Sequence, residues 1–161
     1  MSKKSKKPSA TKAELLLESS TFYVDDCLGK TVAVKLRESG WKIEWHRDHF
    51  QRDKVQDTEI YEYIGNLGWH FLTKDKALRR KPIEIDRMLE CGIRVFSLAG
   101  NDMNSEEMAD CFVRNRLAIG RLLKNHSEAF VAYIRKDSAT IPQQVIERME
   151  SAKRRIADAK K

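Results

Sequence analysis

Phe22-Tyr23-Val24-Asp25-Asp26 is a short apolar run that ends in two aspartates. Two further stretches place an acid at the edge of an apolar segment: Asp57-Thr58-Glu59-Ile60-Tyr61 and Trp69-His70-Phe71-Leu72-Thr73-Lys74-Asp75. In a parallel α/β sheet, groups that follow the strands or begin the next helices converge on one crevice. Three distant acids, Asp25, Asp57 and Asp75, are therefore expected to lie close together.

Carboxylates that share one crevice repel one another unless a cation joins them. Two such charges about 4 Å apart repel by about 4 kcal/mol at an effective dielectric constant of about 20. Hard oxygen ligands suit Mg²⁺ or Mn²⁺, whereas Zn²⁺ favours His and Cys. The pattern therefore predicts a divalent-metal site, although each aspartate taken alone is also a common turn or cap residue.

The apolar segments alternate between strand and helix patterns along the middle of the chain. Strands are expected at residues 21–25, 42–46, 69–73 and 93–98, with an edge strand at 129–135. Helices are expected at residues 28–39, from 57, at 83–91 and at 105–124, where Gly120 is a candidate break, and a surface loop at 47–56. This alternation predicts the α/β class, a three-layer α/β/α sandwich with a mainly parallel sheet of four to five strands.

The composition suggests three parts of the chain. Residues 1–20 are expected to be a basic, largely disordered tail with a short helix around residues 12–18, because they are rich in lysine and poor in apolar residues. Residues 21–136 contain the strand and helix patterns and are expected to form the folded domain. Residues 137–161 are expected to form a charged helical extension that begins at Pro142.

Charge and cysteine usage narrow the class of partner and the compartment. The 161 residues carry a formal charge of +7, which favours polyanions such as nucleic acid, although many lysines lie in the two ends. No apolar run approaches the roughly 20 residues that cross a bilayer, and the start lacks a secretory signal, so a cytoplasmic protein without a membrane partner is expected. Cys27, Cys91 and Cys111 are odd in number and widely spaced, and are expected to be small core residues.

The same stretches resemble the PIN-domain superfamily, and especially its compact PIN-like branch. The likeness rests on the run at residues 22–26, a helix that ends in Gly40, Asp57-x-Glu59-Ile60, and a strand that ends in Leu72-Thr73-Lys74-Asp75. It covers about residues 22–98. Members of that family are metal-dependent nucleases, many of them VapC-type ribonuclease toxins that a protein antitoxin restrains. The resemblance implies a PIN-like fold, Mg²⁺ or Mn²⁺ as cofactor, and RNA and an antitoxin as partners; a homodimer is a further candidate.

The resemblance also implies roles for individual residues. Asp25 matches the first-strand aspartate of the family, Asp57 its mid-domain aspartate, and Asp75 the acid of its Thr-x-Asp motif. These three are the expected catalytic and metal-binding residues. The glutamate that the family carries on an intervening helix has no match here, and its candidate substitutes are Asp26, Asp48, Asp53 and Glu59, of which Asp26 and Glu59 are kept as further metal ligands.

Basic and aromatic residues near the third acid are candidates for substrate contact. The expected substrate-binding residues are Thr73, Lys74, Lys76, Arg79 and Arg80, with Lys81 beside them, because cations there could hold an RNA backbone. Trp69, Tyr61 and Tyr63 could stack bases, and the alternative is that they are core residues. His46-Arg47-Asp48-His49 is a weaker metal candidate, because a catalytic zinc site needs three convergent ligands.

The leading interpretation is a divalent-metal-dependent endoribonuclease that hydrolyses RNA phosphodiesters, as the toxin of a type II toxin-antitoxin pair. The alternative is a catalytically weak or inactive PIN-like module that binds RNA or protein, which the missing glutamate would explain. A third interpretation places the working surface on the C-terminal helix, residues 143–161.

Overall fold

One mainly parallel sheet organises the chain. The computed structural model describes residues 11–51, 55–74, 81–100 and 102–160. Within these residues, six strands pair in the order β2-β1-β3-β4-β5-β6. They are β1 (Thr21–Val24), β2 (Lys42–Trp45), β3 (His70–Thr73), β4 (Arg94–Leu98), β5 (Phe130–Arg135) and β6 (Ser138–Thr140). The strands β1 to β5 pair in parallel, and β6 runs antiparallel to β5.

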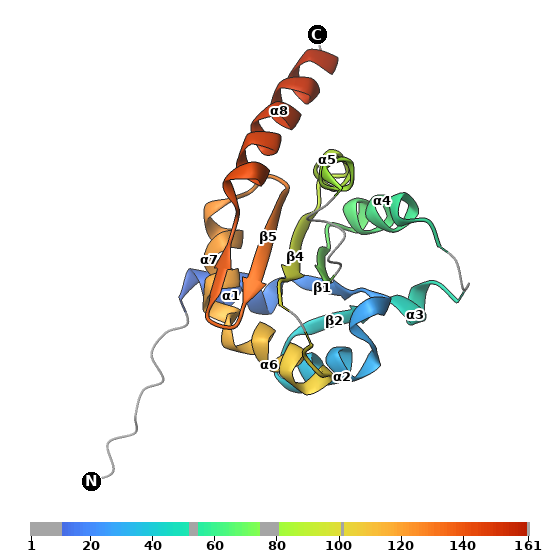
Figure 1. Cartoon of the computed structure of the whole chain (residues 1–161), viewed down its shortest axis with the longest axis vertical. Helices are drawn as coiled ribbons and strands as arrows, with labels where there is room; N and C mark the ends of the chain where they lie inside the picture. The colour runs from blue at the N-terminus through green and yellow to red at the C-terminus, as the bar shows by residue number, and fades with distance from the viewer. Residues whose placement is uncertain (1–10, 52–54, 75–80, 101, 161) are drawn as a thin grey trace.

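Helices cover both faces of the sheet, as Figure 1 shows. The group α4, α5 and α8 lies on one side, where α5 packs against both of the others. On the other side α2 packs against α6, and α7 packs against α6 and α1. The helical segments are α1 (Lys12–Ser19), η1 (Asp26–Leu28), α2 (Lys30–Glu38), α3 (His46–His49), α4 (Asp57–Leu67), α5 (Pro82–Glu90), α6 (Ser105–Arg114), α7 (Arg116–Asn125) and α8 (Gln143–Ala159). The predicted α/β/α sandwich is confirmed.

The central strands form the core because they are apolar on both faces. Phe22 and Phe96 are fully buried and pack against each other with ring centroids 6.1 Å apart. Phe130 meets Phe96 edge to face at 5.4 Å, which continues the aromatic contact into β5. Continuous apolar runs of this kind are typical of parallel strands with helices on both faces.

The sheet has one strand more than the four to five expected. Ser138–Thr140 forms β6, which returns along β5 through a tight turn and pairs Ile134 with Ala139. The segment is short and polar, so its pattern resembles that of a turn. Its strand conformation comes from pairing with the apolar β5.

The helix expected at residues 105–124 is broken at Asn115 and not at Gly120. Asn115 is buried, and its side-chain Nδ2 donates to the carbonyl of Cys111 at 2.8 Å and to that of Arg135 at 2.7 Å. This amide joins the end of α6 to the end of β5. Gly120 lies inside α7 instead, where it faces the backbone of Ala13 in α1.

Both ends of the described chain pack on the central domain. Ala13 and Leu17 of α1 are buried, and Thr11 begins the helix with a capping box that includes Glu14. At the other end, α8 buries Val145, Met149 and Ala152. Its Arg148 also donates to Asp86 of α5 at 2.7 Å.

Two smaller differences separate the observed elements from the expected ones. The helix expected at residues 28–39 begins at Lys30, because the short η1 turn precedes it. The loop expected at 47–56 begins with the single helical turn α3, and its residues 52–54 lie outside the described ranges. None of the helices in the described residues combines the length and apolar character that crossing a membrane requires.

We expect Gly120→Ala to destabilise the protein, although alanine is normally the better helix former by about 1 kcal/mol. A Cβ at this position would stand 2.4 Å from the carbonyl oxygen of Ala13, so α1 and α7 would have to separate. Such overpacking costs about 1–3 kcal/mol. Urea denaturation should show the loss, and the neighbouring exposed Arg121→Ala should change stability by less than about 0.5 kcal/mol. Equal stability of both variants would contradict the close approach.

We also expect the protein to lose stability on mild acidification because of His70. Burial, and then the positive charge of Arg94, lower the pKa of His70 to about 3. In the unfolded chain His70 binds a proton near pH 6.5, whereas in the folded chain it does not. The free energy of unfolding is therefore highest above that pH and falls as the pH falls below it. Between pH 7 and pH 5 the loss should be about 2 kcal/mol by urea denaturation. His70→Phe and His70→Gln should flatten this dependence, and unchanged slopes in both would contradict it.

Candidate functional site

The carboxyl ends of β1 and β3 lie side by side, which brings Asp25 next to Thr73. Val24 pairs with Leu72 in the parallel register, and the backbone N–H of Asp25 donates to the carbonyl of Leu72 at 3.0 Å. Two of the sequence stretches that were expected to converge therefore share one edge of the sheet.

Three donors hold the carboxylate of Asp25. Its Oδ1 accepts the backbone N–H of Asp26 at 2.8 Å, and this bond begins the η1 turn. Its Oδ2 accepts the hydroxyl of Thr73 at 2.9 Å and the thiol of Cys27 at 3.1 Å. Asp25 also lines an open pocket, so a fixed carboxylate faces accessible space.

Thr73 lies behind Asp25 and not on the surface of the pocket. Its side chain is almost fully buried, at 1% exposure, and its hydroxyl is directed to the Asp25 carboxylate. Thr73 was expected to contact a substrate, but its side chain has almost no exposed surface for such a contact. The geometry indicates that Thr73 positions the acid.

Cys27 was expected to be a small core residue, and that prediction is wrong. The residue as a whole is exposed, but its sulfur turns toward Asp25 and lies 3.5 Å from the Thr73 hydroxyl. Burial of the thiol, and then the charge of Asp25, raise the pKa of Cys27 to about 12. At neutral pH it is a protonated donor. Of the other two cysteines, Cys111 is buried as expected and Cys91 is half-buried.

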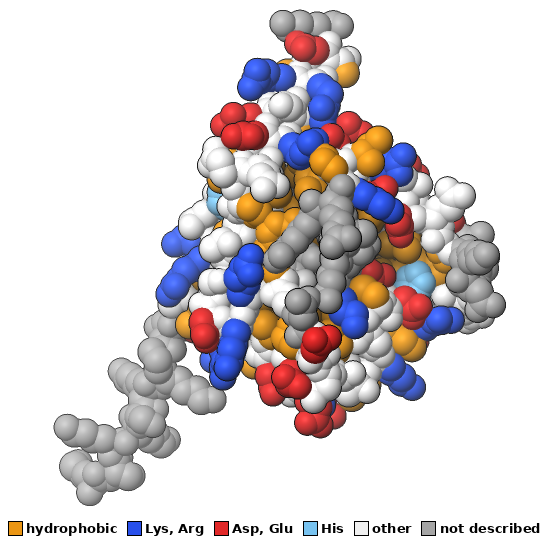
Figure 2. Space-filling model, in the orientation of Figure 1, with side chains coloured by type: hydrophobic (Ala, Val, Ile, Leu, Met, Phe, Trp, Pro, Cys, Tyr) orange, Lys and Arg blue, Asp and Glu red, His pale blue; other side chains and the backbone are white. Residues whose placement is uncertain are grey.

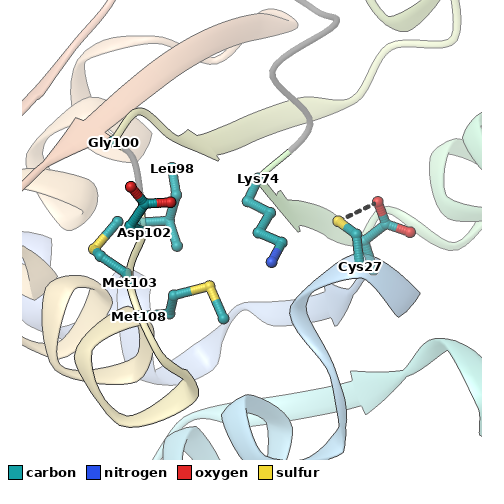
Figure 3. A pocket seen from close by; sticks show the side chains of 8 residues that line it. Cys27, Lys74, Leu98, Gly100, Asp102, Met103 and Met108 are labelled. Atoms are coloured by element: carbon teal, nitrogen blue, oxygen red, sulfur yellow. Dashed lines mark hydrogen bonds between the residues drawn. The ribbon is translucent and has the colours of Figure 1, made fainter.

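A pocket of ≈ 530 Å³ opens beside the acid. One side carries Asp25, Cys27 and Lys74, and the amine of Lys74 extends from the end of β3 into the open space (Figure 3). The opposite side comes from the end of β4, the loop that follows it, and the start of α6. Its residues are Leu98, Gly100, Asp102, Met103 and Met108.

Asp57 lies in the first turn of α4, as expected from the sequence. Tyr61, one turn further along α4, is buried and donates to Glu84 of α5 at 3.3 Å. Burial is the main cause that raises the pKa of Tyr61, and the charges of Asp57, Glu84 and Asp25 raise it further. Two of the three expected site acids, Asp57 and Asp25, therefore lie close enough to this buried phenol to raise its pKa.

Glu84 is a residue that sequence reasoning missed. Its side chain is 16% exposed, and besides Tyr61 it binds Arg87 through Oε1 at 3.0 Å. An acid in the first turn of the helix after the third strand was the available signal. That position also suits simple helix stabilisation, so the sequence alone gave no reason to select it.

The two further candidate ligands differ in their surroundings. Asp26 is bound by Arg47 of α3 through two bonds, Nε to Oδ1 at 2.9 Å and Nη2 to Oδ2 at 3.0 Å. This hydrogen-bonded guanidinium lowers the pKa of Asp26. Glu59 is exposed in the first turn of α4, close in sequence to Asp57. As metal ligands, Asp26 and Glu59 both stay predictions.

The histidine segment at residues 46–49 contacts aromatic and acidic neighbours. His46 is buried and its Nδ1 meets the hydroxyl of Tyr23. The ring nitrogens of His49 meet Tyr63 at 2.9 Å and Glu44 at 2.8 Å. The rings of His46 and His49 therefore have different partners.

Of the three aromatic residues considered for base stacking, one is buried and two are half-buried. Tyr61 is only 4% exposed. Trp69 and Tyr63 meet edge to face at 6.0 Å, and both rings also contact His49. Burial favours the core interpretation for Tyr61, and the ring contacts of Trp69 and Tyr63 show that both pack against protein neighbours.

The third acid lies outside the described residues. This acid is Asp75, and the same is true of three expected cations, Lys76, Arg79 and Arg80, and of one candidate acid, Asp53. Within the ranges that are described, no group of three His, Cys, Asp or Glu side chains is close enough to hold a metal ion. The donors that are described still favour one class of metal, because the carboxylate oxygens of Asp25 and Asp57 are hard ligands. This set fits Mg²⁺ or Mn²⁺ better than a thiolate-bound Zn²⁺.

Charge is mixed over the face shown in Figure 2. Lys and Arg side chains alternate there with Asp and Glu, and hydrophobic side chains lie between them. The formal charge of +7 is therefore not concentrated into one cationic patch on the described part of this face. Lys74 is the described Lys or Arg residue that lines the pocket.

Two comparisons with known proteins place this geometry in context. A family model described as "PIN like domain" matches residues 20–100, half of the chain, from the start of β1 to just beyond β4. A curated protein of Mycobacterium tuberculosis that carries the name "Putative ribonuclease VapC45" is 28% identical over 111 residues, which covers 66% of this chain and 80% of that protein. A search of solved structures found no significant match. The region that the family model matches, residues 20–100, contains Asp25, Asp57 and Asp75.

Proposed function

This chain belongs to the PIN-like domain family, and we propose that it is a divalent-metal-dependent endoribonuclease. One observation carries the proposal: the Asp25 carboxylate is fixed by Thr73 and Cys27 at the rim of an open pocket, within the region that matches the family. The name of the mycobacterial relative supports a ribonuclease.

The proposed cofactor is Mg²⁺ or Mn²⁺. Asp25, Asp57 and Asp75 are the proposed ligands, with Asp26 and Glu59 as further candidates, and Arg47 binds the carboxylate of Asp26 in the structure. When bound, such an ion lowers the pKa of water and offsets charge that builds on a phosphate during in-line attack.

The protein's own residues divide the remaining tasks. Thr73 holds Asp25 in one orientation, which limits the reorganisation needed when the acid binds a cation. Lys74 projects into the pocket and is the proposed contact for a phosphate of the substrate. Lys76, Arg79 and Arg80 keep the same predicted role. Lys81 is exposed at the start of α5.

A role as the toxin of a toxin-antitoxin pair rests on the similarity to VapC45 alone. The proposal adds a protein antitoxin as partner and a cytoplasmic site of action, which the free cysteines favour. A second copy of the chain as a partner stays a prediction. An adjoining small reading frame whose product binds this protein would support the pair.

We expect Asp25→Asn to lower RNA cleavage by at least about 100-fold. The change keeps the size of the side chain and removes the charge that binds the cation, and a loss of about 3 kcal/mol of transition-state stabilisation corresponds to that factor. Cleavage of a mixed RNA pool should be measured with Mg²⁺, with Mn²⁺ and with EDTA. Asp110→Asn on the exposed side of α6 is the matched control and should cleave as wild type does.

Two results would oppose the nuclease proposal. Wild type that binds RNA but cuts none with either metal would favour the non-catalytic module. Cleavage that persists in EDTA and in Asp25→Asn would show that the activity does not use this site.

We also expect Thr73→Val to weaken metal binding by about 10–100-fold, the range measured for outer partners of metal ligands. Valine fills the same space but cannot donate to Asp25, whereas Thr73→Ser keeps the hydroxyl and should stay within a few-fold of wild type. Titration of Mn²⁺ by calorimetry, with folding checked by circular dichroism, separates these variants. If Val and Ser behave alike, the hydroxyl does not position the acid.

A further inference from the structure

The pocket beside Asp25 has a second wall that the proposed hydrolysis does not use. It is formed by Leu98 at the end of β4, the loop that follows, and the first turns of α6. Leu98 and Met108 are almost fully buried, at 3% and 5% exposure, so their positions are fixed by the core. Met103 is half-buried and also lines the pocket, and Figure 3 shows the sulfur of Met108 on the side that faces Lys74.

This wall suits a flat aromatic group. Thioether sulfurs are polarisable and make favourable contacts with aromatic rings, and two methionines contribute here. Gly100 helps to shape the wall, because a Cβ at this position would stand 3.1 Å from the terminal methyl of Met103 and would displace it. Because residue 100 has no side chain, the Met103 methyl can lie close to its backbone.

Asp102 adds a polar end to the apolar wall. It has a φ of 58°, which is uncommon for a residue other than glycine but better tolerated by Asp and Asn. Its carboxylate is exposed at the pocket, and within the described residues no hydrogen bond or ion pair is recorded for it. An exposed acceptor at the end of an apolar slot matches a ligand with N–H donors on its edge.

The two sides of the pocket carry charges of opposite sign. Lys74 is the cation on the Asp25 side. Asp102 is the carboxylate on the other side. A nucleotide has the matching order, with a phosphate at one end and donor groups on its base at the other.

We propose that this pocket is a nucleobase subsite selective for guanine, next to a phosphate held by Lys74. Guanine is the base that offers two adjacent donors, N1–H and N2–H₂, on one edge, so it can give both carboxylate oxygens of Asp102 a hydrogen bond. The base would lie against Met103 and Met108. This inference rests on the proposed function for its biological meaning, because it makes guanosine the preferred nucleotide at the cleavage site.

Nucleotide binding without metal tests the subsite independently of cleavage. The probes are the four 5′-monophosphates, GMP, AMP, CMP and UMP, titrated by NMR in EDTA. GMP should bind most tightly, and Asp102→Asn should weaken GMP by about tenfold or more while changing the other three much less. Asparagine tolerates the same φ, so the loop should keep its shape. Asp110→Asn, which removes the same charge from the exposed side of α6, is the control.

Two further variants test the orientation of the ligand. Met103→Ala should weaken all four nucleotides, because it removes the contact with the ring and not the contact with its edge. Lys74→Gln should weaken GMP but not guanosine, which lacks the phosphate. Equal affinity for the four nucleotides, or GMP binding that Asp102→Asn leaves unchanged, would overturn the subsite.

Sequencing the ends of cleaved RNA separates this inference from the proposed function. Cuts concentrated beside G in wild type and spread over all four bases in Asp102→Asn support both. Cleavage with no preference for G overturns the subsite and leaves the nuclease standing. Selective GMP binding by a protein that cuts no RNA overturns the nuclease and leaves the subsite standing.

Discussion

The hydrogen bond from Thr73 to Asp25 is the contact on which the site depends, and the pairing of β1 with β3 makes it. Val24 lies opposite Leu72 in that pairing, so the residues that follow them, Asp25 and Thr73, lie next to each other. Successive side chains on a strand point to opposite faces. A slip of one residue would turn the Thr73 hydroxyl away from the acid and would move Leu72, which is fully buried here, out of its packed position in the core. The apolar core therefore fixes the geometry of a polar contact.

The acids at this edge have different hydrogen-bond partners, so they differ in whether a positive charge already offsets the carboxylate. Asp26 faces the guanidinium of Arg47, and Glu84 faces Arg87 and the Tyr61 hydroxyl. Asp25 instead accepts bonds from a neutral hydroxyl, a neutral thiol and a backbone N–H. Neutral donors orient a carboxylate without cancelling its charge. Among these three acids, Asp25 keeps the charge that a cation would bind.

The sequence predicted the parts of this structure that local patterns determine. Apolar runs bounded by acids located β1 and β3, and the alternation with amphipathic helices predicted the parallel sandwich. It could not predict features made by distant partners. The break at Asn115 depends on a carbonyl of β5, twenty residues away. β6 forms because β5 offers it an edge, and the orientation of Cys27 depends on Thr73. For the site, Asp25 and Lys74 were singled out from the sequence and line the pocket, whereas Glu84 had only the signal of an acid in a first helical turn and Asp102 was not selected.

The two walls of the pocket come from different sources of structural constraint. Asp25, Thr73 and Lys74 follow adjacent parallel strands, so the sheet itself places them, and any fold with this topology gathers groups there. Leu98 is also placed by a strand, but Asp102 and Met103 belong to the loop before α6. The capping box of Asn104 and Glu107 fixes where that helix begins, and thus where the loop must turn. Loops can vary without disturbing the core, because few buried contacts depend on them. Chemistry shared by a family therefore belongs on the strand side, and the loop side is where this chain can differ in what it selects.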